Sequence, residues 1–125
     1  MARTIRLGGG AEFDLIRRLS AAGEDVDPLP PEVMVGSGDD AAVLRDGWVV
    51  STDLSVEDVH FRRGWIGDEE IGYRAAISGL SDLAAMGASP VALLLSIAAP
   101  RGGAVDIEAV SRGVRAAAVR YGAAV

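Results

Sequence analysis

Carboxylates set among small side chains are the residues of this sequence whose types could do chemistry. They occur at Asp39-Asp40, at Asp53 and at Asp82, and Glu57 and Asp58 follow soon after Asp53. Asp82 lies in a stretch, residues 79–86, whose other side chains are apolar or small. A carboxylate in such surroundings needs a partner, because burial of an unpaired charge is costly. Oxygen ligands, with no Cys and one His in the chain, are typical of Mg²⁺ or Mn²⁺ sites rather than of zinc sites.

Each of these residues also has an ordinary structural explanation when it is taken alone. Asp39-Asp40 could form a solvated turn, and Asp53 could cap a turn or a helix. A lone histidine in a loop, here His60, is most often structural or exposed to solvent. The metal hypothesis therefore depends on whether the secondary structure brings the acids together.

A predicted β-hairpin is the first element that would do so. Two apolar runs, 41–44 and 48–52, flank Arg45-Asp46-Gly47, and Asp-Gly between such runs is a strong hairpin signal. Asp39-Asp40 begin one arm, and Ser51-Thr52-Asp53 end the other. Because opposite ends of antiparallel neighbours meet, we expect the two acidic clusters to lie close together.

The remaining pattern predicts an α+β domain. Helices are expected over 11–22, from about 69 to 86, and from a cap at Asp106 to a stop at Gly122; strands are expected over 33–35 and 91–98. The middle helix is rich in Ala, Gly and Ser, so we expect a neighbour to pack very close to it. Residues 123–125 resemble the first residues of another strand, which suggests a fragment of a longer protein.

Composition limits the classes of function. The chain has 125 residues, half of them hydrophobic, and a formal net charge of −6. One domain with its own core fits this length, whereas an acidic chain is a poor candidate for binding nucleic acid or anionic membranes. No Cys is present, which excludes disulfides, thiolate zinc sites and Cys nucleophiles. The start of the chain has no secretory signal pattern and no apolar run could span a bilayer, so a cytoplasmic location is expected.

The segment Gly36-Ser37-Gly38-Asp39-Asp40-Ala41 superficially matches the dinucleotide-binding pattern G-x-G-x-x-A. That pattern requires a helix after the glycines, whereas a strand pattern follows here. Two adjacent carboxylates would also repel a pyrophosphate. Any phosphate bound here would be held through divalent cations that bridge carboxylates to phosphate oxygens.

Five blocks, taken in order and spacing, resemble the N-terminal domain of the bacterial thiamine-monophosphate kinase family. They are Glu12-Phe13-Asp14-Leu15-Ile16, Gly38-Asp39-Asp40-Ala41-Ala42-Val43, Ser51-Thr52-Asp53, Val56-Glu57-Asp58-Val59-His60-Phe61 and Ser81-Asp82-Leu83-Ala84-Ala85-Met86-Gly87-Ala88. The last block is specific to the superfamily that also contains aminoimidazole ribonucleotide synthetase, selenophosphate synthetase and the hydrogenase maturation factor HypE. The resemblance covers about residues 11–125.

The resemblance implies direct transfer of the γ-phosphoryl group of ATP to the phosphate of thiamine monophosphate, assisted by Mg²⁺. It implies that Asp40, Ser51, Thr52, Asp53 and Asp82 are metal ligands, with Ser51 the weaker one. Asp39 would contact these ligands rather than the metal, and His60 would line the thiamine phosphate site. No residue is expected to act as a covalent nucleophile. The implied fold is a mixed sheet of about four strands with helices on one face, and two copies would pair their sheets in a homodimer.

The chain departs from the family pattern in three places. Ser37 stands where Ile is common, and Asp58 stands where many members have Gly. The family also continues with a Gly-Gly-Asp block and a second domain, so we expect this chain to be inactive by itself. Two alternatives remain: another ATP-using member of the superfamily, such as a HypE-like protein, and a non-catalytic dimerisation module.

Overall fold

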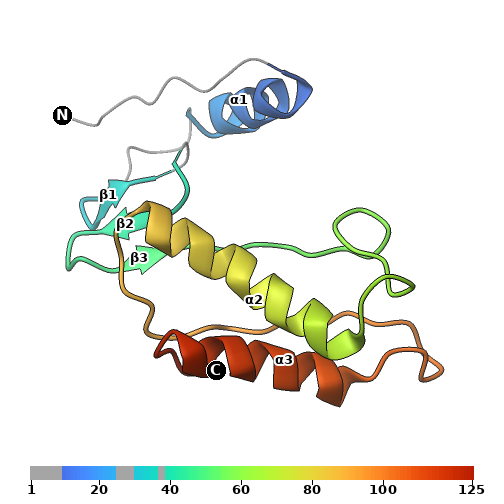
Figure 1. The fold of residues 1–125 in the computed structure, drawn as a ribbon. Coiled ribbons are helices and arrows are strands. Elements are labelled where there is room, and N and C mark those ends of the chain that lie inside the picture. Colours follow the sequence, from blue (N-terminus) through green and yellow to red (C-terminus); the bar gives the residue numbers. More distant parts are fainter. Residues whose placement is uncertain (1–9, 25–29, 37–38) are drawn as a thin grey trace. The chain divides into compact units, whose positions relative to one another are not determined.

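A computed structural model describes residues 10–24, 30–36 and 39–125, in two units that divide after Ser51. The first unit holds helix α1 (Ala11–Glu24) and strands β1 (Val33–Val35), β2 (Ala42–Leu44) and β3 (Val49–Val50). The second unit holds helices α2 (Asp68–Ala85) and α3 (Ile107–Arg120) (Figure 1). The Gly36-Ser37-Gly38 loop lies partly outside the described residues.

The three strands form an antiparallel sheet in the order β1-β2-β3. The predicted hairpin joins β2 to β3, with Ala42 opposite Val50 and Val43 opposite Val49. Gly47 has a φ of 85° in its turn, a left-handed conformation that favours glycine. The Asp-Gly signal is therefore confirmed as a hairpin turn.

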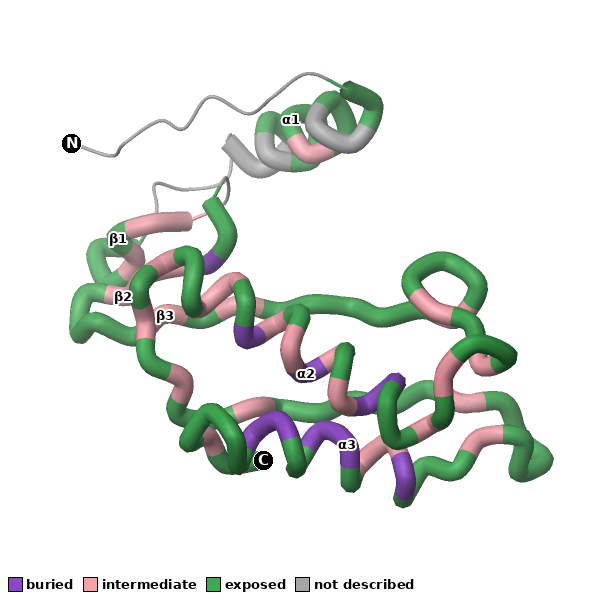
Figure 2. The backbone as a smooth tube through the Cα atoms, in the orientation of Figure 1, coloured by how far each residue is buried: buried purple, intermediate pink, exposed green. Residues whose placement is uncertain are grey.

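Helices α2 and α3 pack together and supply most of the buried side chains of the second unit. Ile71, Ala76 and Leu80 of α2 are buried, as are Val114 and Ala117 of α3 (Figure 2). A Cβ placed on Gly72 would collide with the carbonyl oxygen of Val110, and one placed on Gly113 would collide with that of Glu69. The two helices thus touch through their backbones, which explains why α2 is built from small residues.

Local interactions define the helix ends that the sequence predicts. Asp106 caps α3, because its Oδ1 accepts a hydrogen bond of 2.9 Å from the Ala109 N–H. Gly87 and Gly122, with φ of 70° and 74°, follow the last turns of α2 and α3. Helix α2 begins at Asp68, one residue before the predicted start, and no helix in the described ranges is long and apolar enough to cross a membrane.

The α+β class is confirmed, whereas the segment 91–98 differs from the predicted strand. Within the part of the chain that the structure describes, its backbone pairs only near its start, where Ala92 forms a parallel bridge with Ala124. The Leu93 N–H donates to the Ala124 carbonyl (2.8 Å), and the Ala124 N–H donates to that of Val91 (2.9 Å). Residues 94–98 have no neighbouring strand among the described residues, so they form no ladder.

Candidate functional site

The hairpin of the first unit brings one pair of predicted ligands together. The Ser51 hydroxyl donates to the main-chain carbonyl of Asp40, with an oxygen–oxygen distance of 3.4 Å. The Asp40 N–H in turn donates to Oδ1 of Asp39 at 3.0 Å. Asp40 is exposed, so its carboxylate is accessible to a ligand. The expectation that the two hairpin arms meet at these residues is thus met for Asp40 and Ser51.

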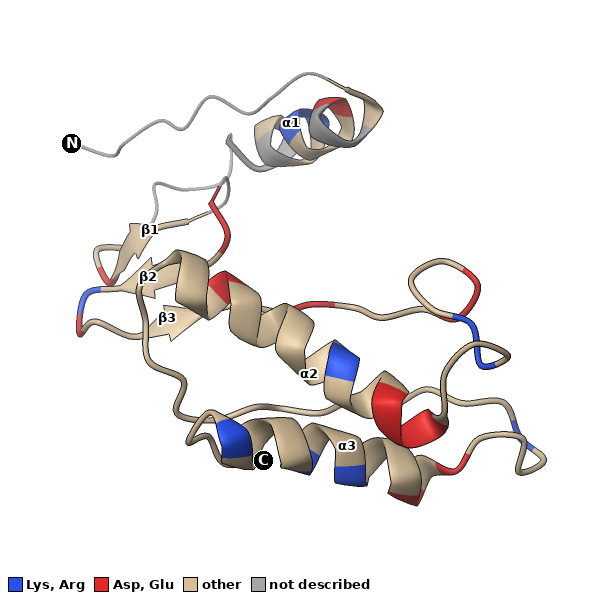
Figure 3. Cartoon of the chain, viewed as in Figure 1, with Lys and Arg blue, Asp and Glu red and all other residues tan. Residues whose placement is uncertain are grey.

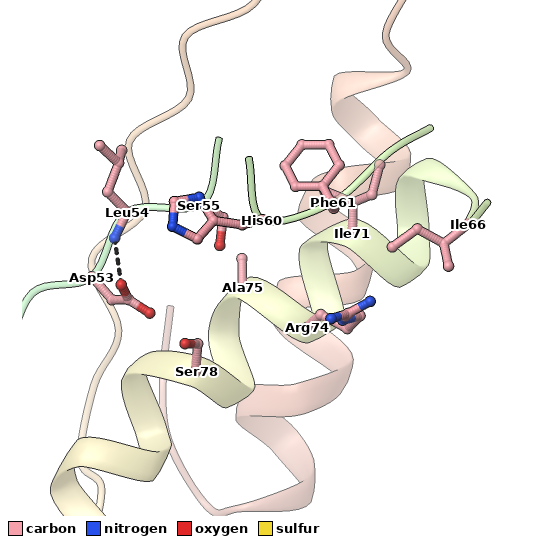
Figure 4. A pocket seen from close by; sticks show the side chains of 10 residues that line it. All are labelled: Asp53, Leu54, Ser55, His60, Phe61, Ile66, Ile71, Arg74, Ala75 and Ser78. Carbon is pink, nitrogen blue, oxygen red and sulfur yellow. Dashed lines mark hydrogen bonds between the residues drawn. The ribbon is translucent and has the colours of Figure 1, made fainter. Parts of the chain in front are cut away.

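The second unit contains a cavity of about 220 Å³ between the 53–66 loop and α2 (Figure 4). Two predicted site residues, Asp53 and His60, line it. The other lining residues are Leu54, Ser55, Phe61, Ile66, Ile71, Arg74, Ala75 and Ser78. Ile71, Arg74, Ala75 and Ser78 are spaced by three or four residues, so they occupy one side of α2.

The backbone of the 56–61 loop orients the His60 imidazole. Val56 both donates its N–H to Nδ1 of His60 (3.0 Å) and accepts the His60 N–H at its carbonyl (2.8 Å). Because Nδ1 accepts a hydrogen bond, the neutral ring carries its proton on Nε2. His60 therefore offers an N–H donor, which suits a phosphate oxygen.

The two acidic residues near His60, Glu57 and Asp58, pair with arginines of the same loop. Glu57 accepts a hydrogen bond from Nε of Arg63 at 2.7 Å, and this bond raises the pKa of the Arg63 guanidinium above its ordinary value. Arg63 also donates to the Ala104 carbonyl at 2.5 Å, which ties two loops together. Asp58 pairs with Arg62 at 3.6 Å and has a φ of 62°, a conformation that favours Gly.

The remaining predicted ligands lie in the second unit. Oδ1 of Asp53 accepts the N–H of Leu54 at 2.7 Å, and Thr52 and Asp53 are both exposed. Asp82 is half-buried on α2, one helical turn beyond Ser78. Within the ranges that the structure describes, no three His, Asp or Glu side chains converge on one point. The predicted ligand set includes residues of both units, so it stays a prediction.

Arg74 and Ser78 are cavity residues that the sequence analysis did not select. The signal that could have found them is the spacing 71, 74, 78 and 82, which places Arg74 and Ser78 on the same helical stripe as Asp82. From the sequence alone, however, this pattern cannot be distinguished from an ordinary solvent-facing side of a helix.

Comparison with known proteins gives the family. Residues 38–125 match the model described as "AIR synthase related protein, N-terminal domain". The chain belongs to this family. The match includes Asp40, Asp53, His60 and Asp82, so these predicted site residues lie within the AIR synthase related domain.

Curated relatives of this AIR synthase related domain carry the name thiamine-monophosphate kinase. The protein of Corynebacterium glutamicum is 36% identical over 124 residues, which cover 94% of this chain and 34% of the relative. Those of Mycobacterium tuberculosis and Bacillus subtilis are 38% and 41% identical, over 71% of this chain in each case. The chain thus spans between about a quarter and a third of the relatives' length. No solved structure matches it.

Proposed function

We propose that this chain is the N-terminal, ATP- and Mg²⁺-binding domain of a thiamine-monophosphate kinase. The observation that carries the proposal is its alignment, over 94% of its length, with the Corynebacterium glutamicum protein of that name. The cavity lined by Asp53 and His60 supports it, because those two residues come from separate motif blocks and line one space. The reaction would convert thiamine monophosphate and ATP to thiamine diphosphate and ADP.

The chemistry needs no covalent intermediate on the protein. A phosphate oxygen of thiamine monophosphate would attack the γ-phosphorus of ATP as the bond to the β-phosphate oxygen breaks, so that ADP leaves with the electron pair. Positioning and charge neutralisation supply most of the catalysis in such transfers. The Nε2–H of His60 would donate to the acceptor phosphate and hold it in place.

Five residues would hold Mg²⁺: Asp40, Ser51, Thr52, Asp53 and Asp82. Their donors are all oxygen atoms, which fits Mg²⁺. One oxygen of Asp53 bonds the Leu54 N–H, which orients the carboxylate while the other oxygen can face a ligand. When bound, Mg²⁺ would neutralise the charge that the ATP phosphates bring to an acidic protein.

We further infer that the domain forms a mixed sheet of about four strands with helices on one face. The parallel bridge at Ala92 would start the added pairing. The segment 91–98 exposes Val91, Leu94, Leu95 and Ile97, with Leu94 fully exposed. Two copies pairing through this segment would cover these apolar side chains in a homodimer.

The activity would require sequence beyond this domain, because the relatives are about three times as long. Residues 1–125 alone would then be inactive. A kinase that consumes ATP would act in the cytoplasm.

A chimaera tests the proposal. Residues 1–125 would replace the aligned third of the Corynebacterium glutamicum protein, and thiamine diphosphate formation would be followed by chromatography with fluorescence detection. We expect Mg²⁺-dependent product. A chimaera that binds Mg-ATP but makes no thiamine diphosphate would favour another member of the superfamily, and one that dimerises without binding nucleotide would favour a dimerisation module.

Substitution of the predicted ligands sharpens the test. Asp53→Asn and Asp82→Asn should each lower kcat/KM about 100-fold or more, because each removes a carboxylate charge that would hold the Mg²⁺ that neutralises the transferring phosphoryl group. Asp46→Asn is the matched control: Asp46 is exposed in the hairpin turn, and Asn-Gly serves that turn equally well. Unchanged activity and Mg²⁺ dependence in Asp53→Asn or Asp82→Asn would reject that residue as a ligand.

A further inference from the structure

Arg74 is the one cationic residue of α2 (Figure 3). Acidic residues occupy the first turn of this helix, at Asp68, Glu69 and Glu70. Arg74 follows one turn later on the cavity side, and Asp82 lies a further eight residues along, about 12 Å at the rise of an α-helix. Arg74 is therefore the charged residue that α2 contributes to the cavity lining, and Asp82 lies beyond the lining residues.

The guanidinium of Arg74 has no partner among the residues that the structure describes. Three other arginines of the second unit are engaged: Arg62 pairs with Asp58, Arg63 with Glu57, and Arg112 with Glu69 and Asp106. No side-chain hydrogen bond, ion pair or ring contact of Arg74 occurs within the described ranges. Asp53 also lines this cavity, but its carboxylate accepts the Leu54 N–H and forms no ion pair with Arg74, so the guanidinium is available to an anionic ligand.

The neighbours of Arg74 in the cavity are suited to a phosphate group. His60 offers its Nε2–H, and Ser78, one turn along α2 from Arg74, offers a hydroxyl. A guanidinium, an imidazole N–H and a hydroxyl are three donors of the kind that bind phosphate oxygens. Ile66, Ile71 and Phe61 give the rest of the cavity apolar walls.

We propose that Arg74 binds the phosphate monoester of the acceptor directly, without a bridging metal. The inference rests on the proposed function for the identity of the acceptor, thiamine monophosphate. Arg74 would then select phosphorylated thiamine over free thiamine, because only the former presents an anion to the guanidinium. Metal ions held by the aspartates would serve the ATP phosphates instead.

A titration of the 125-residue chain tests the site without kinase activity. Inorganic phosphate, then thiamine monophosphate, then thiamine would be added in metal-free buffer, and binding would be followed by NMR shifts of the His60 ring and the Arg74 side chain. We expect both phosphate compounds to shift these signals and thiamine to leave them unchanged. Arg74→Gln should weaken phosphate binding about tenfold, the usual order for loss of a charge-assisted hydrogen bond.

Arg115→Gln is the matched control, because Arg115 also lines a cavity but has only Ala and Val side chains around it there. It should bind phosphate as the parent chain does. Arg74→Lys keeps the charge and should retain part of the binding, and circular dichroism would verify that each variant is folded. Equal phosphate binding by Arg74→Gln and the parent chain, or no shift at His60 with any phosphate compound, would overturn the proposal.

A second experiment distinguishes whether Arg74 binds the phosphate of thiamine monophosphate or a phosphate of ATP. In the chimaera, Arg74→Gln should raise KM for thiamine monophosphate about tenfold and leave KM for ATP unchanged. A rise in KM for ATP alone would overturn the assignment to the acceptor. A parent chimaera without kinase activity would reject the proposed function but would leave the titration result unaffected, so the two failures are distinguishable.

Discussion

At the scale of single residues, the loop 56–61 determines how the candidate site presents its imidazole. Val56 holds both the backbone and the ring of His60, while Asp58 takes the left-handed conformation that lets the chain turn back so that its N–H reaches the Phe61 carbonyl at 2.7 Å. This left-handed backbone is a physical reason for Gly to be common at position 58 in the family that the sequence resembles. Asp is among the few non-Gly residues that tolerate this conformation.

Substitution of Asp58 should change stability in a defined order. Asp58→Gly should be as stable as the parent or slightly more stable, whereas Asp58→Ala should lose about 1 kcal/mol, because Ala lacks both the freedom of Gly and the local hydrogen bonding of Asp. Urea unfolding would measure the difference. Equal urea midpoints for the Ala and Gly variants would contradict the prediction that the left-handed backbone at position 58 disfavours Ala.

At the scale of elements, α2 has two sides with different roles. Gly72 and Ala76 face the buried contact with α3, and Ile71, Arg74, Ala75 and Ser78 line the cavity. The contact with α3 keeps α2 in place beside the 53–66 loop, which belongs to the same unit. The backbone contact between the helices therefore supports the geometry of the cavity.

Enlarging the glycines tests that contact. Gly72→Ala should destabilise the protein by about 1–3 kcal/mol, because the added methyl group would force the α3 backbone away. Gly79→Ala is the control on the same helix: nothing lies within 4 Å of its added Cβ, so it should be neutral or stabilising by up to about 1 kcal/mol. Thermal unfolding of both variants gives the comparison. An unchanged or raised unfolding temperature in Gly72→Ala would contradict the close backbone contact at this position.

At the scale of the whole molecule, the exposed apolar segment 91–98 is the main feature left for a partner. Leu94 is fully exposed and Val91 is more than half exposed, although the segment is the most apolar stretch of the chain. Single exposed apolar residues are ordinary, but a run of them beside an unpaired backbone is typical of an interface.

The proposed homodimer gives a direct prediction for this segment. Leu94→Arg should shift the protein from dimer to monomer in sedimentation velocity, because a charge would be buried at the pairing surface. Val119→Arg is the control, since Val119 is 79% exposed on α3 and outside the segment. A parent protein that sediments as a monomer at all accessible concentrations would reject the homodimer.

The sequence by itself determined the features that depend on neighbours along the chain. The hairpin turn at Asp46-Gly47, the Asp106 cap and the helix ends at Gly87 and Gly122 all rest on contacts within a few residues, and each is where the sequence predicts it. The tertiary structure alone decided which side of α2 packs on α3 and which side lines the cavity. That choice depends on contacts across about 40 residues, such as Gly72 with Val110, so Arg74 and Ser78 could be recognised as cavity residues only in the folded chain. The segment 91–98 shows the same limit: its apolar character predicts a strand, but a strand forms only where a neighbouring backbone is present to pair with it.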